Sequence, residues 1–140
     1  MPVPPETVWD VLADPRAYAY WVVGSKVIRD AEPGWPDPGT KFHHTIGAGP
    51  FKVSDHTVSI EARPPHLLTI RAKGRPIGTA TVTMKMHPKD GGTVVEMVEN
   101  PDGIYRPLAL NPAVHVATKL RNTESLMRLE ELALRRAGLA

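Results

Sequence analysis

Three histidines and an aspartate lie close together in residues 41–60, KFHHTIGAGPFKVSDHTVSI. Imidazole and carboxylate groups bind metals or transfer protons, so His43, His44, Asp55 and His56 are candidate site residues. Neighbours on a strand point to opposite faces, which prevents His43 and His44 from binding one ion together, and the chain has no HExxH or His-x-His spacing. The chain has no cysteine, which excludes sulfur-based zinc sites. We therefore expect neither a metal nor a cofactor.

The composition is that of an ordinary soluble globular protein. The 140 residues are 41% hydrophobic and 23% charged, and a chain of this length can form one domain, residues 1–140, with its own core. The net charge of +2 comes from 17 basic residues scattered among 15 acids, so we expect no nucleic-acid partner. No segment is long enough to insert into a membrane, and MPVPPETVWD lacks a signal-peptide pattern. A cytoplasmic location is expected.

The period of the hydrophobic pattern changes along the chain and predicts an α+β fold. The prolines of PPETVWDVLADP begin and end a short helix, and RAYAYWVVG predicts a second one. Alternating residues separated by Gly and Pro turns then predict six antiparallel strands. They are expected near Lys26–Asp30, Thr40–Ile46, Phe51–Glu61, Leu67–Lys73, Gly78–Met86 and Thr93–Glu99. Asn111 and Pro112 form a cap and first-turn pair for a long helix that ends near Arg136.

The long helix has two contrasting faces. One is a polar stripe with two Glu-to-Arg pairs four residues apart, made of Glu124, Arg128, Glu131 and Arg135. The opposite arc is apolar and is made of Val116, Leu126, Met127, Leu129, Ala133 and Leu134. His115 and Asn122 interrupt this arc one heptad apart, so we expect both to point toward the sheet, where they are buried or line a site.

Strand alternation predicts which side chains face inward. Phe42, His44 and Ile46 share the apolar face of their strand, which leaves His43 outside. In the next strand His56 shares a face with Val58 and Ile60, which makes it the favoured second inward histidine, although a bulge could exchange the two faces.

Alternation in the later strands places more apolar side chains inside. Leu68 and Ile70 are expected inward, as are Val82, Met84 and Met86. The pattern around Met97 and Glu99 is ambiguous, because apolar residues occupy both faces of that strand.

The segments ETVWDVLADPRAYAYWVVGSKVIR, WPDPGTKFHHTIGAGP, DHT and RNTESLMRL resemble the SRPBCC superfamily, also called START-like or polyketide cyclase/dehydrase proteins. The resemblance covers about Glu6 to Arg136. It implies a helix-grip fold, in which a curved antiparallel sheet of six to seven strands surrounds a long C-terminal helix, with two short helices near the N-terminus. It also implies a cavity that holds sterols, lipids, aromatic polyketides or phenolics in different members, and it favours Glu99 inside.

One departure concerns the first strand. Relatives place a strand before the helix pair, whereas only Met1–Pro5 precede it here. An uncovered sheet edge exposes backbone donors and acceptors. We therefore expect this edge to be covered by a strand upstream of Met1, by a second copy in a homodimer or by a loop.

These observations favour binding of a hydrophobic or aromatic small molecule, such as a lipid, polyketide or phenolic, between the sheet and the long helix. The expected lining consists of apolar Trp21, Phe42, Ile46, Val82, Met84 and Met97 with polar His44, His56, Glu99, His115 and Asn122. The alternative is an enzyme of the polyketide cyclase/dehydratase type that uses His44 or Glu99 as a general acid/base. A third reading is an interaction module that uses the outer sheet face. An enzyme needs an opposed acid and base, whereas a carrier does not, and the sequence leaves the choice open.

Overall fold

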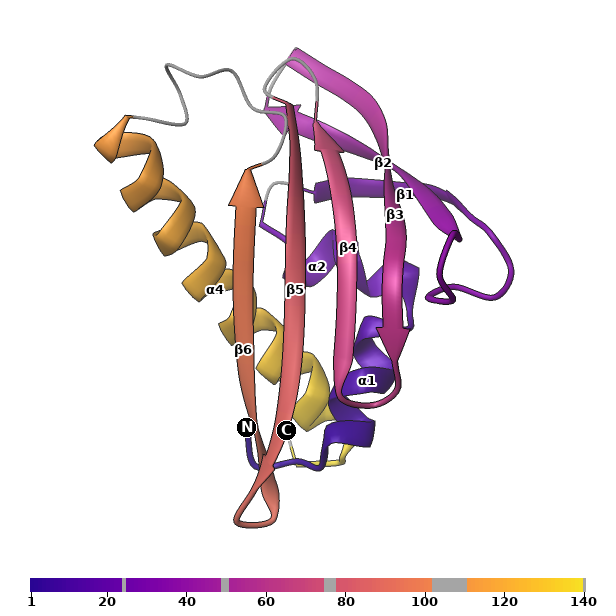
Figure 1. Cartoon of the computed structure of the whole chain (residues 1–140), viewed down its shortest axis with the longest axis vertical. Helices are drawn as coiled ribbons and strands as arrows, with labels where there is room; N and C mark the ends of the chain where they lie inside the picture. The colour runs from indigo at the N-terminus through magenta and orange to yellow at the C-terminus, as the bar shows by residue number, and fades with distance from the viewer. Residues whose placement is uncertain (24, 49–50, 75–77, 102–110, 140) are drawn as a thin grey trace.

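The computed structural model contains one six-stranded antiparallel sheet with its helices on one side (Figure 1). The structure describes the chain except residues 24, 49–50, 75–77, 102–110 and 140, and it leaves out the side chains of residues 24–29, 45–55, 74–78 and 101–110. The helices are α1 (Pro5–Leu12), the 3-10 turn η1 (Pro15–Ala17), α2 (Tyr18–Trp21) and α4 (Pro112–Arg136). The strands are β1 (Ser25–Ala31), β2 (Lys41–Ala48), β3 (Phe51–Arg63), β4 (Leu67–Gly74), β5 (Gly78–Lys89) and β6 (Gly92–Pro101). The predicted α+β order is confirmed.

The sheet is a simple meander in the order β1-β2-β3-β4-β5-β6. Asp90 and Gly91 both have positive φ and join β5 to β6 in a two-residue turn, the connection that Asp-Gly favours between twisted strands. Register shifts interrupt the β1–β2 pairing and the β3–β4 pairing at Ser59/Glu61. Such irregularities increase the local bend of a strand and help a sheet to curve.

The first residues of the chain lie against the start of β6. Met1 donates from its ammonium group to the Thr93 carbonyl at 2.8 Å and accepts from the Thr93 amide at 2.8 Å. The Thr93 hydroxyl donates to the Val3 carbonyl at 2.7 Å. A Cβ on Gly92 would lie 2.5 Å from the Met1 carbonyl oxygen, so only glycine permits this approach. The N-terminus therefore covers the beginning of β6, and cover of the remaining edge stays a prediction.

The core is built around an aromatic cluster between the short helices and the sheet. The Tyr18 ring lies 4.8 Å from both the Trp21 and Phe42 rings, and Trp35 lies 4.7 Å from Phe42. Both the Tyr18 hydroxyl and the Trp35 indole N–H donate to the Leu12 carbonyl, at 3.3 and 3.2 Å. These bonds satisfy a carbonyl at the end of α1, where helical partners run out. Burial raises the pKa of Tyr18 well above its usual value.

Helix α4 begins at the predicted cap and packs over only part of its length. The Asn111 side chain accepts from the Ala113 amide at 2.9 Å. Ser125, Leu129 and Ala133 are buried, and α4 packs chiefly against α1 and α2. Both predicted Glu-to-Arg pairs of the polar stripe form.

The predicted inward arc of α4 is wrong in two places. Val116 is 59% exposed and Met127 is 68% exposed. Leu126 and Leu134 are partly buried, and they pack against the core that contains Leu129. The helical wheel had combined two stripes into one arc, and only one of them faces the core.

Candidate functional site

The inner face of β2 carries Phe42 and His44, as predicted. Both side chains are buried, and their rings lie 5.8 Å apart. His44 Nε2 shares a hydrogen bond of 2.9 Å with the hydroxyl of Thr57 on β3. A buried imidazole needs such a partner, because leaving it without one would cost about 1–3 kcal/mol. His44 is therefore an interior polar group, held by a neighbouring strand.

The prediction that His56 faces inward is wrong. His56 pairs with His43 across the β2–β3 ladder, and their rings lie 6.1 Å apart. Opposite residues in a ladder share a face, so His56 lies on the outer side with His43. The inner face of β3 instead carries Thr57 and Ser59, both buried.

The exchange of faces in β3 has a physical reason. Ser59 donates from its hydroxyl to the Pro36 carbonyl at 2.6 Å, and Thr57 binds His44. Partners supplied by other segments make these small polar residues stable inside. Ile60, on the face expected to be inward, is 44% exposed.

Strands β5 and β6 supply the apolar part of the candidate site. Val82 pairs with Glu99 and Met84 pairs with Met97 across the ladder, so all four side chains share the inner face. Val82 and Met84 are buried, whereas Met97 and Glu99 are half-buried. The ambiguous pattern of β6 is thereby resolved in favour of Met97 and Glu99 facing inward.

Glu99 connects the sheet to α4. Arg121 Nη2 on the helix lies 2.6 and 2.7 Å from the two carboxylate oxygens of Glu99. The Glu99 side chain is only 13% exposed, so this pair is more shielded from water than a surface ion pair. Sequence reasoning missed Arg121, which directly precedes Asn122 in the sequence but lies about 100° from it around the helix axis.

The two polar residues predicted on α4 have different surroundings. Asn122 is half-buried, and its side-chain oxygen accepts from Arg121 at 3.4 Å. His115 is exposed, so the prediction that it is buried is wrong, and its predicted place in the lining of a site stays a prediction. The helix separates from the core toward its N-terminal end, and a wheel cannot show such a divergence.

Trp21 lies in the aromatic cluster and is buried. Its indole Nε1 has no hydrogen-bond partner among the described residues. A buried N–H donor without an acceptor is unfavourable by about 1–3 kcal/mol. Ile46 continues β2 beyond His44, but its predicted inward side chain lies outside the described part of the chain.

The predicted residues thus form two separate groups in the structure, and some of them belong to neither group. Phe42 and His44 lie deep on β2, and Glu99 and Asn122 both lie beside Arg121 at the junction of β6 and α4. His56 and His115 belong to neither set. The use of His44 or Glu99 as a general acid/base stays a prediction, which a turnover assay would test.

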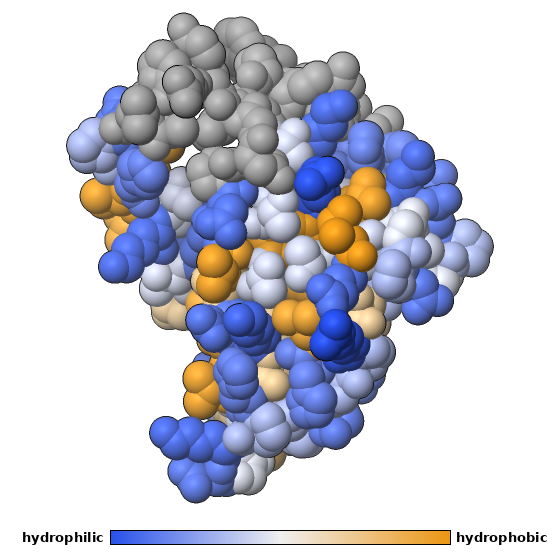
Figure 2. Space-filling view, viewed as in Figure 1, coloured by the Kyte–Doolittle hydropathy of each residue, from blue (hydrophilic) through white to orange (hydrophobic). Residues whose placement is uncertain are grey.

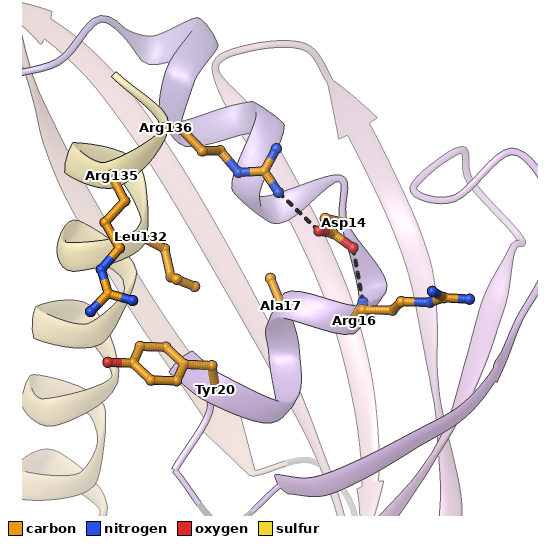
Figure 3. Close-up of a pocket in the computed structure, with 7 residues that line it drawn as sticks. All are labelled: Asp14, Arg16, Ala17, Tyr20, Leu132, Arg135 and Arg136. Atoms are coloured by element: carbon orange, nitrogen blue, oxygen red, sulfur yellow. Dashed lines mark hydrogen bonds and ion pairs between the residues drawn. The ribbon is translucent and has the colours of Figure 1, made fainter. Parts of the chain in front are cut away.

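A separate groove of about 420 Å³ lies between η1–α2 and the end of α4 (Figure 3). Arg136 binds the Asp14 carboxylate at 2.9 Å, and the Tyr20 hydroxyl donates to Glu131 at 2.7 Å. The Arg135 guanidinium lies 6.0 Å from the centre of the Tyr20 ring and also pairs with Glu131. These polar groups bind one another across the groove. We therefore interpret the contacts as structural ones that hold α4 against the short helices.

Within the described residues, no group of three or more His, Cys, Asp or Glu side chains could hold a metal ion. Among the helices described, none is both long and apolar enough to cross a membrane.

Comparison with known proteins identifies the relatives of this chain. The model of the family described as polyketide cyclase/dehydrase and lipid transport matches residues 1–133. No curated protein matches the chain significantly. Ara h 8.0201 superposes with a TM-score of 0.74 at 15% identity, over 96% of this chain and 92% of that one. Protein CV1439 of Chromobacterium violaceum gives 0.69 at 22%, over 95% and 91%. A Rhodobacter sphaeroides protein gives 0.73 at 21%, over 100% and 89%. At these identities the likeness shows the shared fold, which is the helix-grip fold.

Proposed function

Because the chain belongs to the polyketide cyclase/dehydrase and lipid transport family, we propose that it binds a hydrophobic or aromatic small molecule between the inner face of β5–β6 and α4. Family membership supports hydrophobic ligand binding in general. The finer proposal concerns the place and the residues. It assigns the apolar contacts to Val82, Met84 and Met97, and the orienting contacts to Glu99 and Asn122.

One observation carries the proposal: among the described residues, the inner face of β6 and the facing side of α4 bury each other only in part. Val95 and Met97 lie on the inner face of β6, yet both are only half-buried. Thr118 and Asn122 lie on the side of α4 that Arg121 ties to β6, and both are half-buried as well. Apolar side chains that face a helix normally gain about 25 cal/mol per Å² by contact with it. A ligand with an apolar body would supply the contact that the helix does not.

Polar groups at the same place support selection of a ligand that also has hydrogen-bonding atoms. Asn122 offers both an amide donor and an acceptor. Ligand sites of this type are mainly apolar, with a few polar groups that fix orientation. A phenol, a polyketide or a fatty acyl compound fits this combination.

The first test is native mass spectrometry of the protein purified from its own host. The proposal predicts an additional mass that leaves when the protein is denatured. The extracted compound should have an apolar body with at least one oxygen atom. A protein that carries no additional mass and binds no apolar probe would contradict the proposal.

A matched pair of variants locates the site. Met97→Glu introduces a charge on the inner face of β6, whereas Val98→Glu introduces the same charge on the exposed outer face. Binding of the apolar fluorophore ANS should weaken by about tenfold or more in Met97→Glu, because a carboxylate is costly to desolvate. It should be unchanged in Val98→Glu. Equal binding by both variants would place the ligand elsewhere.

A further inference from the structure

The side of α4 that faces away from the core is apolar from Val116 to Met127. Val116, Leu120 and Met127 are 59%, 67% and 68% exposed. Isolated exposed apolar residues are normal on protein surfaces, but a contiguous set marks an interaction surface. Figure 2 shows hydrophobic surface along the margin of the molecule where α4 lies, separate from the hydrophobic patches on the outer face of the sheet.

The spacing of these residues forms a regular seam. Successive steps of four, three and four residues connect Val116, Leu120, Thr123 and Met127. Steps of three and four keep side chains on one side of a helix, and this alternation is the pattern of helices that pair side by side. We call these four residues the outer seam.

We propose that the outer seam is the contact surface of a homodimer, in which α4 packs antiparallel against α4 of a second copy. A two-fold axis near the middle of the seam sets Leu120 of each chain against Met127 of the other. A two-fold interface uses the same surface on both chains. The antiparallel arrangement also sets the positive end of each helix dipole beside the negative end of the other.

Charge complementarity favours a second copy as the occupant. Lys119 and Glu130 flank the seam on the same side, and the two-fold axis that pairs Leu120 with Met127 also sets Lys119 of each chain against Glu130 of the other. Neither side chain has an ion-pair partner among the described residues. Two complementary pairs would thus form in each dimer.

The remaining charges are compatible with this arrangement. Glu124 lies near the proposed axis, and Arg128 of its own helix binds it at 2.6 Å, which offsets the repulsion between the two copies. Charges of both signs flank the seam, with Glu131 and Arg135 on its other side. A helix that lies on an anionic membrane has mainly basic flanks instead. The seam therefore suits a protein surface of mixed charge.

Sedimentation velocity over a wide range of protein concentration tests the proposal. The wild-type chain should shift toward twice the monomer mass as its concentration rises. Lys119→Glu and Glu130→Lys should each weaken the dimer by about tenfold, since each replaces two attractions with two repulsions. The double variant should restore dimerisation. Lys119 and Glu130 of one helix are about 16 Å apart along its axis, so this rescue requires contact between two chains.

A second pair of variants separates the seam from other surfaces. Leu120→Glu should abolish dimerisation and leave the thermal stability of the dilute monomer unchanged, because Leu120 is exposed in the monomer. Val94→Glu changes an exposed apolar residue on the outer face of β6, and it should leave the dimer intact. A wild-type chain that stays monomeric throughout would overturn the proposal. So would a dimer that Val94→Glu disrupts and Leu120→Glu does not. Neither result bears on ligand binding, which uses the opposite side of the helix.

Discussion

The two halves of α4 belong to one helix but meet the rest of the molecule differently. In residues 125–136, Ser125, Leu129 and Ala133 are buried against the core. In residues 112–124 no side chain is fully buried, and the described tie to the sheet is the Arg121–Glu99 pair. Figure 1 shows the same divergence, with the start of α4 beyond the β6 edge and its end behind the sheet.

The two halves therefore have different roles. Residues 125–136 stabilise the fold, and residues 112–124 offer surfaces for binding. Burial of apolar side chains supplies most of the favourable free energy of folding, so the C-terminal half holds the helix against the core. The N-terminal half contributes little to the core, and its two sides remain available. One side faces β6, where we propose the ligand, and the other side carries most of the outer seam.

The strongest test of this contrast compares one substitution in the two halves. Leu129→Ala should lower the free energy of unfolding by about 2–5 kcal/mol, because it leaves a cavity at a fully buried position. Leu120→Ala should change it by less than about 0.5 kcal/mol, because that side chain is exposed. Chemical denaturation of dilute protein measures both. Similar losses of unfolding free energy at the two positions would contradict the difference between the two halves of α4.

A second test concerns how the C-terminal half is fastened. The Ser125 hydroxyl accepts from the Val23 amide at 3.1 Å, which ties the segment after α2 to the helix. Ser125→Ala leaves that amide without its acceptor and should cost about 1–3 kcal/mol. Thr123→Ala is the matched control, since Thr123 is exposed and its described side-chain bond goes to the Lys119 carbonyl of its own helix. Its effect on thermal unfolding should be small.

A third test uses pH to probe the core that holds Leu129. Burial raises the pKa of Tyr18 above the usual 10.0, so the folded state favours the neutral phenol. This contribution is complete below pH 10, where the unfolded chain is also neutral, and it is lost as the pH rises further. Stability should fall by about 1.4 kcal/mol for each pH unit above 10.

The control for this test is the neighbouring tyrosine. Tyr18→Phe should remove most of the decline in stability above pH 10. Tyr20→Phe should remove little of it, because Tyr20 is 42% exposed. A decline that persists unchanged in Tyr18→Phe would assign it to other groups.

The smallest expected effect on folding comes from the N-terminal half. Asn122→Leu should alter the affinity for an apolar ligand more than it alters stability. Asn122 is half-buried and its described bond to Arg121 is long, at 3.4 Å, so its loss should cost less than about 1 kcal/mol. Thermal melts and ANS titrations on the same preparations compare the two effects. A large drop in melting temperature without a change in affinity would place Asn122 in a structural network.

Much of the fold could be predicted from local patterns, because strand alternation and turn residues act over short distances. The inward faces of β2, β4 and β5 followed from this alternation, as for Phe42 and Val82. β3 was assigned the wrong face, because Thr57 and Ser59 find their partners on β2 and at Pro36. Partners that are distant in sequence leave no trace in a local pattern.

The assignment of α4 failed for a different reason. A helical wheel gives the direction of each side chain around the axis, but it does not say where the helix leaves the core. His115 and Val116 therefore looked like Leu129 on the wheel, although they lie where the described core no longer reaches. The separation of the N-terminal half of α4 from the core explains the wrong prediction, and the proposed function rests on the same feature.

Hydrogen–deuterium exchange with and without ANS tests the central claim most directly, since it reports both halves of α4 in one experiment. Without the probe, amides in residues 112–124 should exchange faster than those in residues 125–136. With the probe, protection should rise in residues 112–124 and 94–100 and stay unchanged in residues 125–136. Protection confined to the groove beside Asp14 and Tyr20, or to the outer strand β1, would contradict the account.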